Sequence, residues 1–242
     1  MKGFYYISLF LILLSCNPDG VGCFKSTGDQ ETVAVEIADF TTIDVSGDIE
    51  VHVSSGGVKK VEVTAGGNII PGIRTEVIDG VLYLDNLNTC NWTRKYVNPV
   101  VEITSPALTK IAQHGFGKII STGTLNYDKL TLENTEGAGD FILDVNVQSL
   151  RIGSNEVANF YLKGRAEQLE IGFYYADEIF FGEELLVDNC VLTHYGSNSI
   201  HLNVSGSIQG SIYSYGDVIL HKQMPQLIEV TESENGKLLF VP

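Results

Sequence analysis

The chain has 242 residues, with 15 Lys and Arg against 30 Asp and Glu, which gives a formal net charge of −15 at pH 7. Hydrophobic residues make up 44% of the chain and charged residues only 19%. These values exclude a long disordered tail and a polybasic surface for nucleic acid. The 25 Gly, 11 Tyr and 11 Phe favour β structure with many turns.

Residues 1–15 predict an export signal. Lys2 precedes an apolar run over residues 4–14 that is interrupted only by Ser8. This run is too short for a bilayer-spanning helix, which needs about 20 residues, but it suits the hydrophobic region of a signal peptide. Residues 13–16, Leu-Leu-Ser-Cys, then resemble the lipobox of bacterial lipoproteins. The resemblance implies that Cys16 is lipidated and becomes the first residue of the mature chain.

Cleavage before Cys16 would remove Lys2 and leave 14 basic against 30 acidic residues, a net charge of −16. Several acyl chains hold a protein firmly, because each buried CH₂ contributes roughly 0.8 kcal/mol. Anionic head groups repel an acidic body, so we expect membrane contact through the lipid only. Residues 16–30 are interpreted as a tether. The expected location is the cell envelope, at the outer membrane.

Three further cysteines follow the lipobox. Cys23 and Cys90 lie in polar, turn-rich stretches and are a candidate disulfide. Such a bridge would stabilise the fold by about 4 kcal/mol through loop entropy; the alternative is two separate thiols. Cys190 occupies an apolar repeat position, so we predict a buried side chain that acts as a small hydrophobic group.

Residues 108–242 repeat an alternating apolar pattern in steps of 18 to 22 residues. Period two on both sides of a Gly- and Asn-rich turn predicts strands. A coil of about 20 residues has no room for a crossover helix, so successive coils must pair directly in parallel, as in a β-helix. The coil starts are predicted at Leu108, Leu130, Leu150, Leu169, Cys190, Ile208 and Leu227.

Each coil is expected to send about four apolar side chains into one shared interior. The irregular step lengths are interpreted as turns that vary around strands of constant length. The first half of each coil supplies one column at the coil starts and a second column at Leu132, Ile152, Ile171 and Leu192, which Gly210 interrupts. The second half supplies Phe141, Phe160, Ile179, Ile200 and Val218, and then Leu143, Leu162, Phe181, Leu202 and Leu220.

Both ends of such a stack need protection, because open strand edges aggregate. Residues 31–107 are β-rich, with turns at Asp79-Gly80 and at residues 46–48 and 55–57, and we expect them to cover the first coil. The segment 227–240 loses the pattern and carries Glu229, Glu232 and Glu234, which oppose the addition of another strand. The predicted fold is therefore all-β, a parallel β-helix with a β-rich N-terminal cap.

Several segments resemble the head GIN domain family, whose members carry the label auto-transporter adhesin and are often bacterial lipoproteins. The similar segments are residues 40–45 (Phe-Thr-Thr-Ile-Asp-Val), 49–53 (Ile-Glu-Val-His-Val), 79–84 (Asp-Gly-Val-Leu-Tyr-Leu) and 101–108 (Val-Glu-Ile-Thr-Ser-Pro-Ala-Leu). The Gly-Ser-Gly-Asp turn that is frequent in the family is only approached, at 136–140 and 215–217. The resemblance covers roughly residues 31–242. It implies a β-helical fold and an envelope role, and it transfers no catalytic residues.

The sequence offers little chemistry for catalysis or for a cofactor. Residues 114–118, His-Gly-Phe-Gly-Lys, lack the spacing of a phosphate-binding loop and are interpreted as a turn between strands. The five histidines show no metal-ligand spacing, and we predict no metal and no cofactor. They are His52, His114, His194, His201 and His221.

Two columns of polar side chains remain as candidate sites. Asp140, Glu178 and Asp217 precede strands in alternate coils, where they could serve glycoside hydrolysis or simply suit the turn. Tyr174, Tyr195 and Tyr213 occupy one position in three consecutive coils. If they face outward they form a ridge for a sugar or a partner protein, and if they face inward they form a buried ladder.

The sequence favours a lipid-anchored, non-catalytic envelope protein that binds a glycan or a surface protein, with the three tyrosines as the candidate ligand site. The first alternative is a carbohydrate-active enzyme that uses the acidic column. The second alternative is a purely structural envelope protein.

Overall fold

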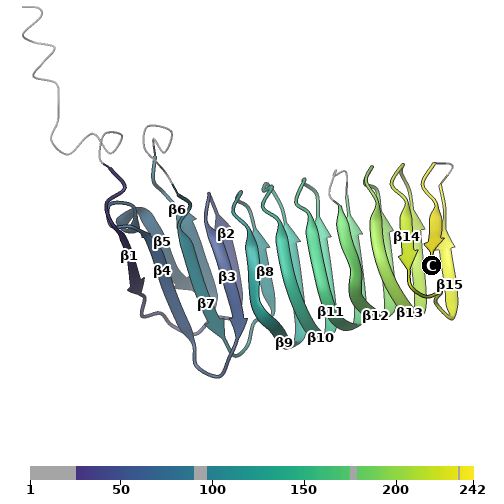
Figure 1. Cartoon of the computed structure of the whole chain (residues 1–242), viewed down its shortest axis with the longest axis horizontal. Coiled ribbons are helices and arrows are strands. Elements are labelled where there is room, and N and C mark those ends of the chain that lie inside the picture. The colour runs from purple at the N-terminus through teal and green to yellow at the C-terminus, as the bar shows by residue number, and fades with distance from the viewer. Residues whose placement is uncertain (1–25, 90–96, 175–178, 234) are drawn as a thin grey trace, which may run out of the picture.

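The computed structural model describes residues 26–89, 97–174, 179–233 and 235–242. The chain forms a β-solenoid of about six turns, with coils stacked side by side along the long axis (Figure 1). A 3₁₀ turn at Ile70–Gly72 interrupts the strands, and the described residues form no α-helix. These findings confirm the predicted all-β parallel solenoid. No helix in the described part is long and apolar enough to cross a membrane.

The strands are β1 (Gln30–Ala34), β2 (Thr42–Ser46), β3 (Glu50–Ser55), β4 (Lys60–Gly66), β5 (Ile73–Ile78), β6 (Val81–Asn86), β7 (Val100–Ser105), β8 (Lys110–Gln113), β9 (Ile119–Asn134), β10 (Phe141–Ser154), β11 (Phe160–Phe173), β12 (Phe180–His194), β13 (Ile200–Ile212), β14 (Val218–His221), β15 (Leu227–Thr231) and β16 (Leu238–Val241).

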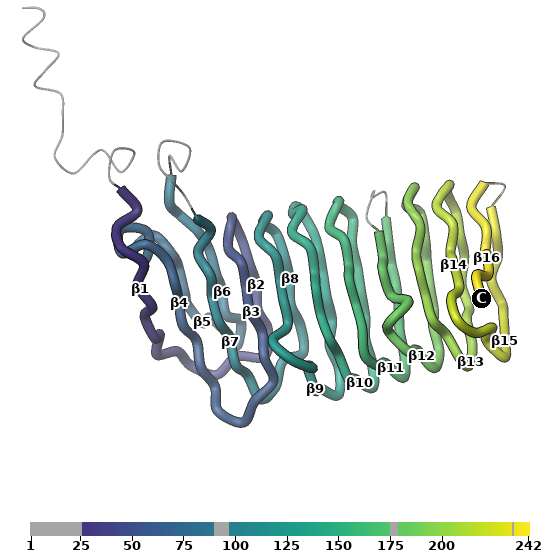
Figure 2. Tube along the Cα trace, viewed as in Figure 1, coloured from purple at the N-terminus to yellow at the C-terminus, as the bar shows by residue number. Residues whose placement is uncertain are grey.

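Each long strand from β9 to β13 bends once, so that its first part runs along one side of the solenoid and its second part along the other (Figure 2). In β10 the first run, Phe141–Val147, and the second run, Ser149–Ser154, each pair in parallel with the matching run of β11. We call the sheet built from the first runs side A and the sheet built from the second runs side B. The turns that link side B of one coil to side A of the next lie together along one edge of the molecule (Figure 1).

The interior of the solenoid is apolar and continuous. On side B, Leu130, Leu150, Leu169, Cys190 and Ile208 are matched in register from coil to coil, and each is at most 2% exposed. This confirms the predicted column and the burial of Cys190. Burial also raises the pKa of the Cys190 thiol to about 12, so the thiolate does not form at neutral pH.

Both predicted interior columns on side A were wrong by one residue at β12. Phe180, which is fully buried, stands opposite Phe160, whereas Ile179 and Phe181 are half-buried. Because three apolar residues stand in a row, alternation alone does not show which of them faces the interior. The space beside Gly182 determines this. A Cβ at Gly182 would lie 2.3 Å from Cε1 of Phe180, so the missing side chain makes room for the Phe180 ring inside. Phe181 consequently faces outward.

Residues 31–107 do more than cover the first coil. Strands β2 and β3 pair in parallel with β8 and β9, and β6 and β7 pair in parallel with β2 and β3, so this section supplies two coils itself. The later pair, β6 and β7, lies farther out than the earlier pair. Strands β4 and β5 then add antiparallel edges to β7 and β6, and β1 pairs with β4. Ile69, which is 1% exposed in the β4–β5 connection, closes the interior.

The C-terminal segment is a coil and not an irregular cap, contrary to the sequence prediction. Strand β15 pairs in parallel with β13, and β16 pairs in parallel with β14. The predicted starts are displaced by one at both ends, because Lys110 stands opposite Thr131 and Ile228 opposite Ile208. Gly210, opposite Leu192 as predicted, has a φ of +135°, and a Cβ there would lie 1.9 Å from the Leu192 carbonyl oxygen.

Candidate functional site

The three tyrosines predicted as a ligand site form a stacked ladder on the outer surface, where side B meets the turns. The ring centroids of Tyr174 and Tyr195 lie 6.0 Å apart, and those of Tyr195 and Tyr213 lie 4.4 Å apart with planes inclined by 9°. Tyr174 is 45% exposed and Tyr213 is 53% exposed. The outward alternative therefore holds, and the inward ladder does not. We call these three side chains the tyrosine ladder.

The one-coil spacing of the tyrosines explains the stacking. Adjacent strands lie about 4.8 Å apart, close to the best separation for parallel aromatic rings. The backbone amide of Tyr195 donates to the Phe173 carbonyl, and that of Tyr213 donates to the His194 carbonyl, which holds the ladder in register. Because stacking covers the ring faces that neighbours share, the ladder presents phenol edges to solvent. A phenol edge combines an apolar rim with a hydroxyl group.

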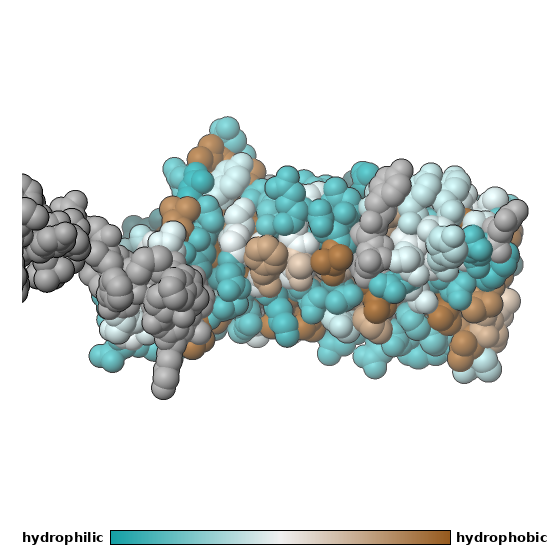
Figure 3. Space-filling view, turned by 90° about the horizontal axis from the view of Figure 1, so that it is seen from above, coloured by the Kyte–Doolittle hydropathy of each residue, from teal (hydrophilic) through white to brown (hydrophobic). Residues whose placement is uncertain are grey.

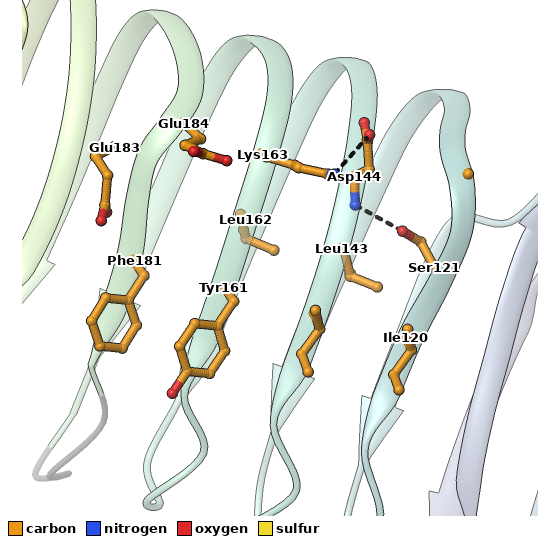
Figure 4. Close-up of a pocket in the computed structure, with 12 residues that line it drawn as sticks. Ile120, Ser121, Leu143, Asp144, Tyr161, Leu162, Lys163, Phe181, Glu183 and Glu184 are labelled. Carbon is orange, nitrogen blue, oxygen red and sulfur yellow. Dashed lines mark hydrogen bonds and ion pairs between the residues drawn. The ribbon is translucent and has the colours of Figure 1, made fainter.

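A second candidate site, which the sequence did not predict, is a groove of about 410 Å³ on side A, across β9 to β12 (Figure 4). Irregular strands form both of its ends. Ser121–Gly123 in β9 stand opposite the single residue Leu143, and Gly182 and Glu183 in β12 stand opposite the single residue Leu162. Bulges of this kind bend a strand and redirect its side chains. We call this site the side-A groove.

The floor of the side-A groove is an apolar stripe. Ile120, Ile142, Tyr161 and Phe181 stand at one register position on four successive coils. The Tyr161 and Phe181 rings stack at 4.6 Å with planes inclined by 4°, and the stack continues to His201 at 5.8 Å. Ile142 and Tyr161 are 36% and 39% exposed, so the stripe is open to solvent.

The rim of the side-A groove is acidic. Asp144, Glu183 and Glu184 line it with one cation, Lys163, whose Nζ lies 3.7 Å from an Asp144 oxygen. The backbone amide of Asp144 also donates to the Ser121 hydroxyl at 2.8 Å (Figure 4). Oε2 of Glu183 is buried and accepts no hydrogen bond from any described residue.

The sequence contained one signal for this groove, the uneven lengths of the coils. The sequence pattern assigns this unevenness to the turns, whereas the structure places the extra residues of β9 and β12 inside strands. The apolar pattern alone cannot locate a bulge, because the segment before it and the segment after it each alternate normally.

The acidic column does not converge on a common point among the described residues. Oδ1 of Asp140 accepts hydrogen bonds from the backbone and side-chain amides of Asn159, at 3.2 and 3.0 Å. Oδ1 of Asp217 accepts one from the backbone amide of Lys237 at 2.9 Å. Each acid thus joins one coil to the next, which is the simple turn role. Glu178 lies outside the described residues.

The histidines have separate environments, except for one pair. Nδ1 of His201 and Nε2 of His221 lie 2.9 Å apart on neighbouring coils, and His52 lies 2.7 Å from Glu50. His114 bonds with Thr135, and His194 is fully buried. Within the described ranges no group of three or more His, Cys, Asp or Glu is placed to hold a metal ion.

Residues 114–118 form the predicted turn between strands. A Cβ on Gly115 would lie 1.9 Å from the Gly47 carbonyl oxygen, and one on Gly117 would lie 1.7 Å from that of Ile49. The glycines thus allow close packing of the coils. The predicted lipid-attachment residue, Cys16, and the candidate disulfide, Cys23 with Cys90, lie outside the described residues.

The two-sided stack of parallel strands, with aromatic side chains on its outer surface, defines a parallel β-solenoid protein. The chain belongs to the family described as "Putative auto-transporter adhesin, head GIN domain", whose sequence model matches residues 39–223. This confirms the family resemblance found in the sequence. The comparison with curated proteins gave no match.

Three solved structures share the fold. A "putative adhesin" from Bacteroides fragilis aligns over 90% of this chain and 100% of its own, with 20% identity and a TM-score of 0.79. A "putative lipid binding protein" from Parabacteroides distasonis aligns over 90% and 100%, with 15% identity and a TM-score of 0.63. A "putative adhesin" from the same species aligns over 89% and 99%, with 16% identity and a TM-score of 0.62. At these identities the likeness establishes the fold alone.

Proposed function

We propose that this chain is a lipid-anchored, non-catalytic binding protein of the cell envelope, which presents the tyrosine ladder to a glycan. The family and two of the neighbouring structures carry adhesin names, which supports a surface or envelope role without catalysis. The lipobox at residues 13–16 supports a lipid anchor at Cys16. The net charge of −15 keeps the body away from anionic head groups and nucleic acid.

The exposure of the tyrosine ladder is the observation that carries this proposal. An apolar edge beside a hydroxyl matches the surface of a sugar, where C–H and O–H groups alternate. The ladder is also rigid, because each ring is stacked on its neighbour and fixed to a continuous sheet. A rigid aromatic site loses little conformational entropy when it binds. The alternative occupant of the ladder is a surface protein, which aromatic side chains also suit.

The enzyme alternative has weaker support. Asp140 and Asp217 already accept hydrogen bonds from the backbone of the following coil. A general acid or base must reach the substrate, and removing these carboxylates from the coil contacts would leave buried amides unpaired. A purely structural envelope protein remains the other alternative, and it predicts no ligand at all.

The test is binding to a broad glycan array by the exported chain carrying Cys16→Ser, which keeps it in solution. Two triple variants accompany it: Ala at positions 174, 195 and 213 removes the rings, and Phe at the same positions removes only the hydroxyls. Tyr215→Ala is the matched control, since Tyr215 is a 70% exposed neighbour of the ladder. Every variant must first show the parent's thermal midpoint within a few degrees.

We expect the parent and the Tyr215→Ala control to bind the same glycans, the Ala triple to bind none, and the Phe triple to bind more weakly. Loss in the Phe triple assigns a hydrogen-bonding role to the hydroxyls. Binding by the folded Ala triple at the parent's level would overturn the ladder as the site. If the parent binds no glycan on the array, the glycan-binding proposal is contradicted and a protein partner should be sought instead.

Lipid anchoring has its own test. The wild-type chain should partition into the detergent phase and carry the mass of a diacyl or triacyl cysteine at its N-terminus. The Cys16→Ser variant should appear in the soluble fraction. A wild-type chain that is exported but stays soluble would contradict the anchor while leaving the ladder untouched.

A further inference from the structure

The side-A groove goes beyond the proposed function, because it lies on the opposite sheet from the tyrosine ladder. Strand irregularities lie at both of its ends, Ser121–Gly123 in β9 and Gly182 with Glu183 in β12. Four coils at about 4.8 Å give a floor of about 14 Å between these ends. A site of limited length and about 410 Å³ suits one discrete small molecule better than a continuous polymer.

The groove combines two chemical surfaces that select the same kind of ligand. Its floor offers the side chains of Ile142 and Tyr161 to an apolar group. Its rim carries three carboxylates and one ammonium group, and that ammonium, on Lys163, pairs with Asp144. Two acidic residues at the β12 end, Glu183 and Glu184, are left in excess (Figure 4).

Glu183 is the more informative of these two acids. Its Oε2 is buried and finds no hydrogen-bond donor among the described residues. A buried carboxylate oxygen without a donor is unfavourable, and such groups usually gain a partner from a ligand, an ion or a water.

His201 is a candidate for neutralising Glu183 from within the protein, because the two side chains interact electrostatically. Burial lowers the pKa of His201, the Glu183 carboxylate raises it by less, and His221 lowers it further, so that His201 is neutral at pH 7. A neutral imidazole adds no positive charge beside Glu183.

We propose that the side-A groove binds a small organic ammonium compound, with its apolar body on Ile142 and Tyr161 and its ammonium group beside Glu183 and Glu184. The ammonium supplies the positive charge that the two excess carboxylates lack. The apolar body covers side chains that otherwise meet water. The net negative charge of the whole chain favours the approach of a cation and disfavours an anion.

The experiment titrates the ¹⁵N-labelled exported chain carrying Cys16→Ser with three matched pairs of probes. Each pair shares one apolar body: hexylamine and heptanoate, phenethylamine and 3-phenylpropionate, tryptamine and indole-3-propionate. We expect at least one amine to shift the amide signals of Ile142 and Tyr161, and its carboxylate partner to bind at least about tenfold more weakly.

Two double variants test the assignment of the charge. Glu183→Gln with Glu184→Gln should weaken amine binding by about tenfold, because both carboxylates are removed while their shape is kept. Glu167→Gln with Glu170→Gln is the matched control, since these exposed acids lie on β11 outside the groove. The control should retain the parent's affinity.

Three outcomes would overturn the proposal: shifts confined to residues outside the groove, equal binding of amine and carboxylate, or no shift with any amine up to its solubility limit. Unchanged affinity in the folded Glu183/Glu184 variant would also overturn it. The groove variants leave the tyrosine ladder intact, so they should bind the glycan array like the parent. Failure of this proposal is therefore distinguishable from failure of the ladder.

Discussion

The two ends of the solenoid differ in how they close the apolar interior. At the N-terminal end, antiparallel strands β4 and β5 extend both sheets, and Ile69 in their connection is 1% exposed. At the C-terminal end, the last coil is β15 and β16, and no described element lies beyond it (Figure 1). Ile228 and Phe240, which continue interior columns, are 39% and 40% exposed there.

This difference indicates an asymmetric stability. In a solenoid each coil contacts only its neighbours, so the stability of a coil depends on whether it is covered on both sides. The N-terminal coils are covered, and their spatial order differs from the chain order, so that β6 and β7 must pair with strands distant in sequence. Among the described residues, the C-terminal coil is covered on one side only. We expect local opening to begin at β15 and β16.

The face of the molecule that carries the turns differs in hydropathy from the two ends. It is mostly hydrophilic, with small separate apolar patches (Figure 3). The face seen in Figure 3 thus carries no continuous apolar patch across the coils. The following predictions test the comparison, from the largest expected effect to the smallest.

Matched leucine truncations at the two ends should give the widest contrast. Leu84 in β6 is 1% exposed, whereas Leu238 in β16 is half-buried. We expect Leu84→Ala to lower the free energy of unfolding by about 3 kcal/mol, because it leaves a cavity that the neighbouring coils cannot fill. Leu238→Ala should cost about 1 kcal/mol or less. Urea denaturation followed by circular dichroism measures both, and equal losses would contradict the asymmetry.

Gly210 lies in β13, the strand on which the terminal coil packs. We expect Gly210→Ala to cost about 2 kcal/mol, because a φ of +135° is strained for alanine and the new Cβ would meet the Leu192 carbonyl oxygen. Gly153→Ala is the matched control, since a Cβ there meets nothing within 4 Å. Hydrogen exchange should show the loss of protection confined to β15 and its neighbours. An unchanged pattern would argue against docking of the last coil at this position.

Acid should weaken the C-terminal half of the stack more than the N-terminal half. His194 is fully buried, with Nε2 3.0 Å from the Asn198 carbonyl oxygen, while the matched positions in β8 and β9 are Gln113 and Asn134. Burial lowers the pKa of His194 below its ordinary value of 6.5, more strongly than the Asn198 hydrogen bond and Asp217 raise it. The unfolded chain therefore binds the proton first, and stability is lost as the pH falls below 6.5.

The measurement is the urea midpoint at a series of pH values from 7.5 downward. His194→Gln can keep a donor toward Asn198 but cannot be protonated, so its midpoint should depend less on pH than the parent's. His201, whose pKa is also lowered by burial, contributes in the same direction and should account for part of the remaining slope. The same slope in parent and variant would exclude His194 as a source of the acid sensitivity.

Cys190 provides the smallest effect, a change in labelling rate without a change in structure. Its thiol is fully buried with a pKa raised to about 12, so a thiol reagent should react only when the coil around β12 opens. In a chain with Cys16, Cys23 and Cys90 replaced by serine, we expect slow labelling of Cys190. Adding Leu238→Ala should increase the labelling rate by more than its small effect on the free energy of global unfolding predicts. Rapid labelling of the native chain would mean that β12 is not protected.

The repeat was predictable because its signal is redundant. Apolar residues recur at the same place in successive coils, and a coil of about 20 residues excludes a helical crossover, so period two in the sequence was sufficient for parallel strands. The burial of Cys190 followed from the same lattice. The strand pairing of residues 31–107 was harder to predict, because pairing between distant strands such as β2 and β6 leaves no periodic pattern in the sequence.

The sequence by itself determined the architecture, the family and the positions of the tyrosines, since all three follow from repeated residue types at repeated spacing. Only the tertiary structure decided that the tyrosines face outward, that Phe180 and not Phe181 is buried, and that a groove lies between two strand irregularities. The reason is that each turn and each bulge resets the alternation of sides. The resulting face depends on packing between coils, such as the space above Gly182, and not on any local pattern.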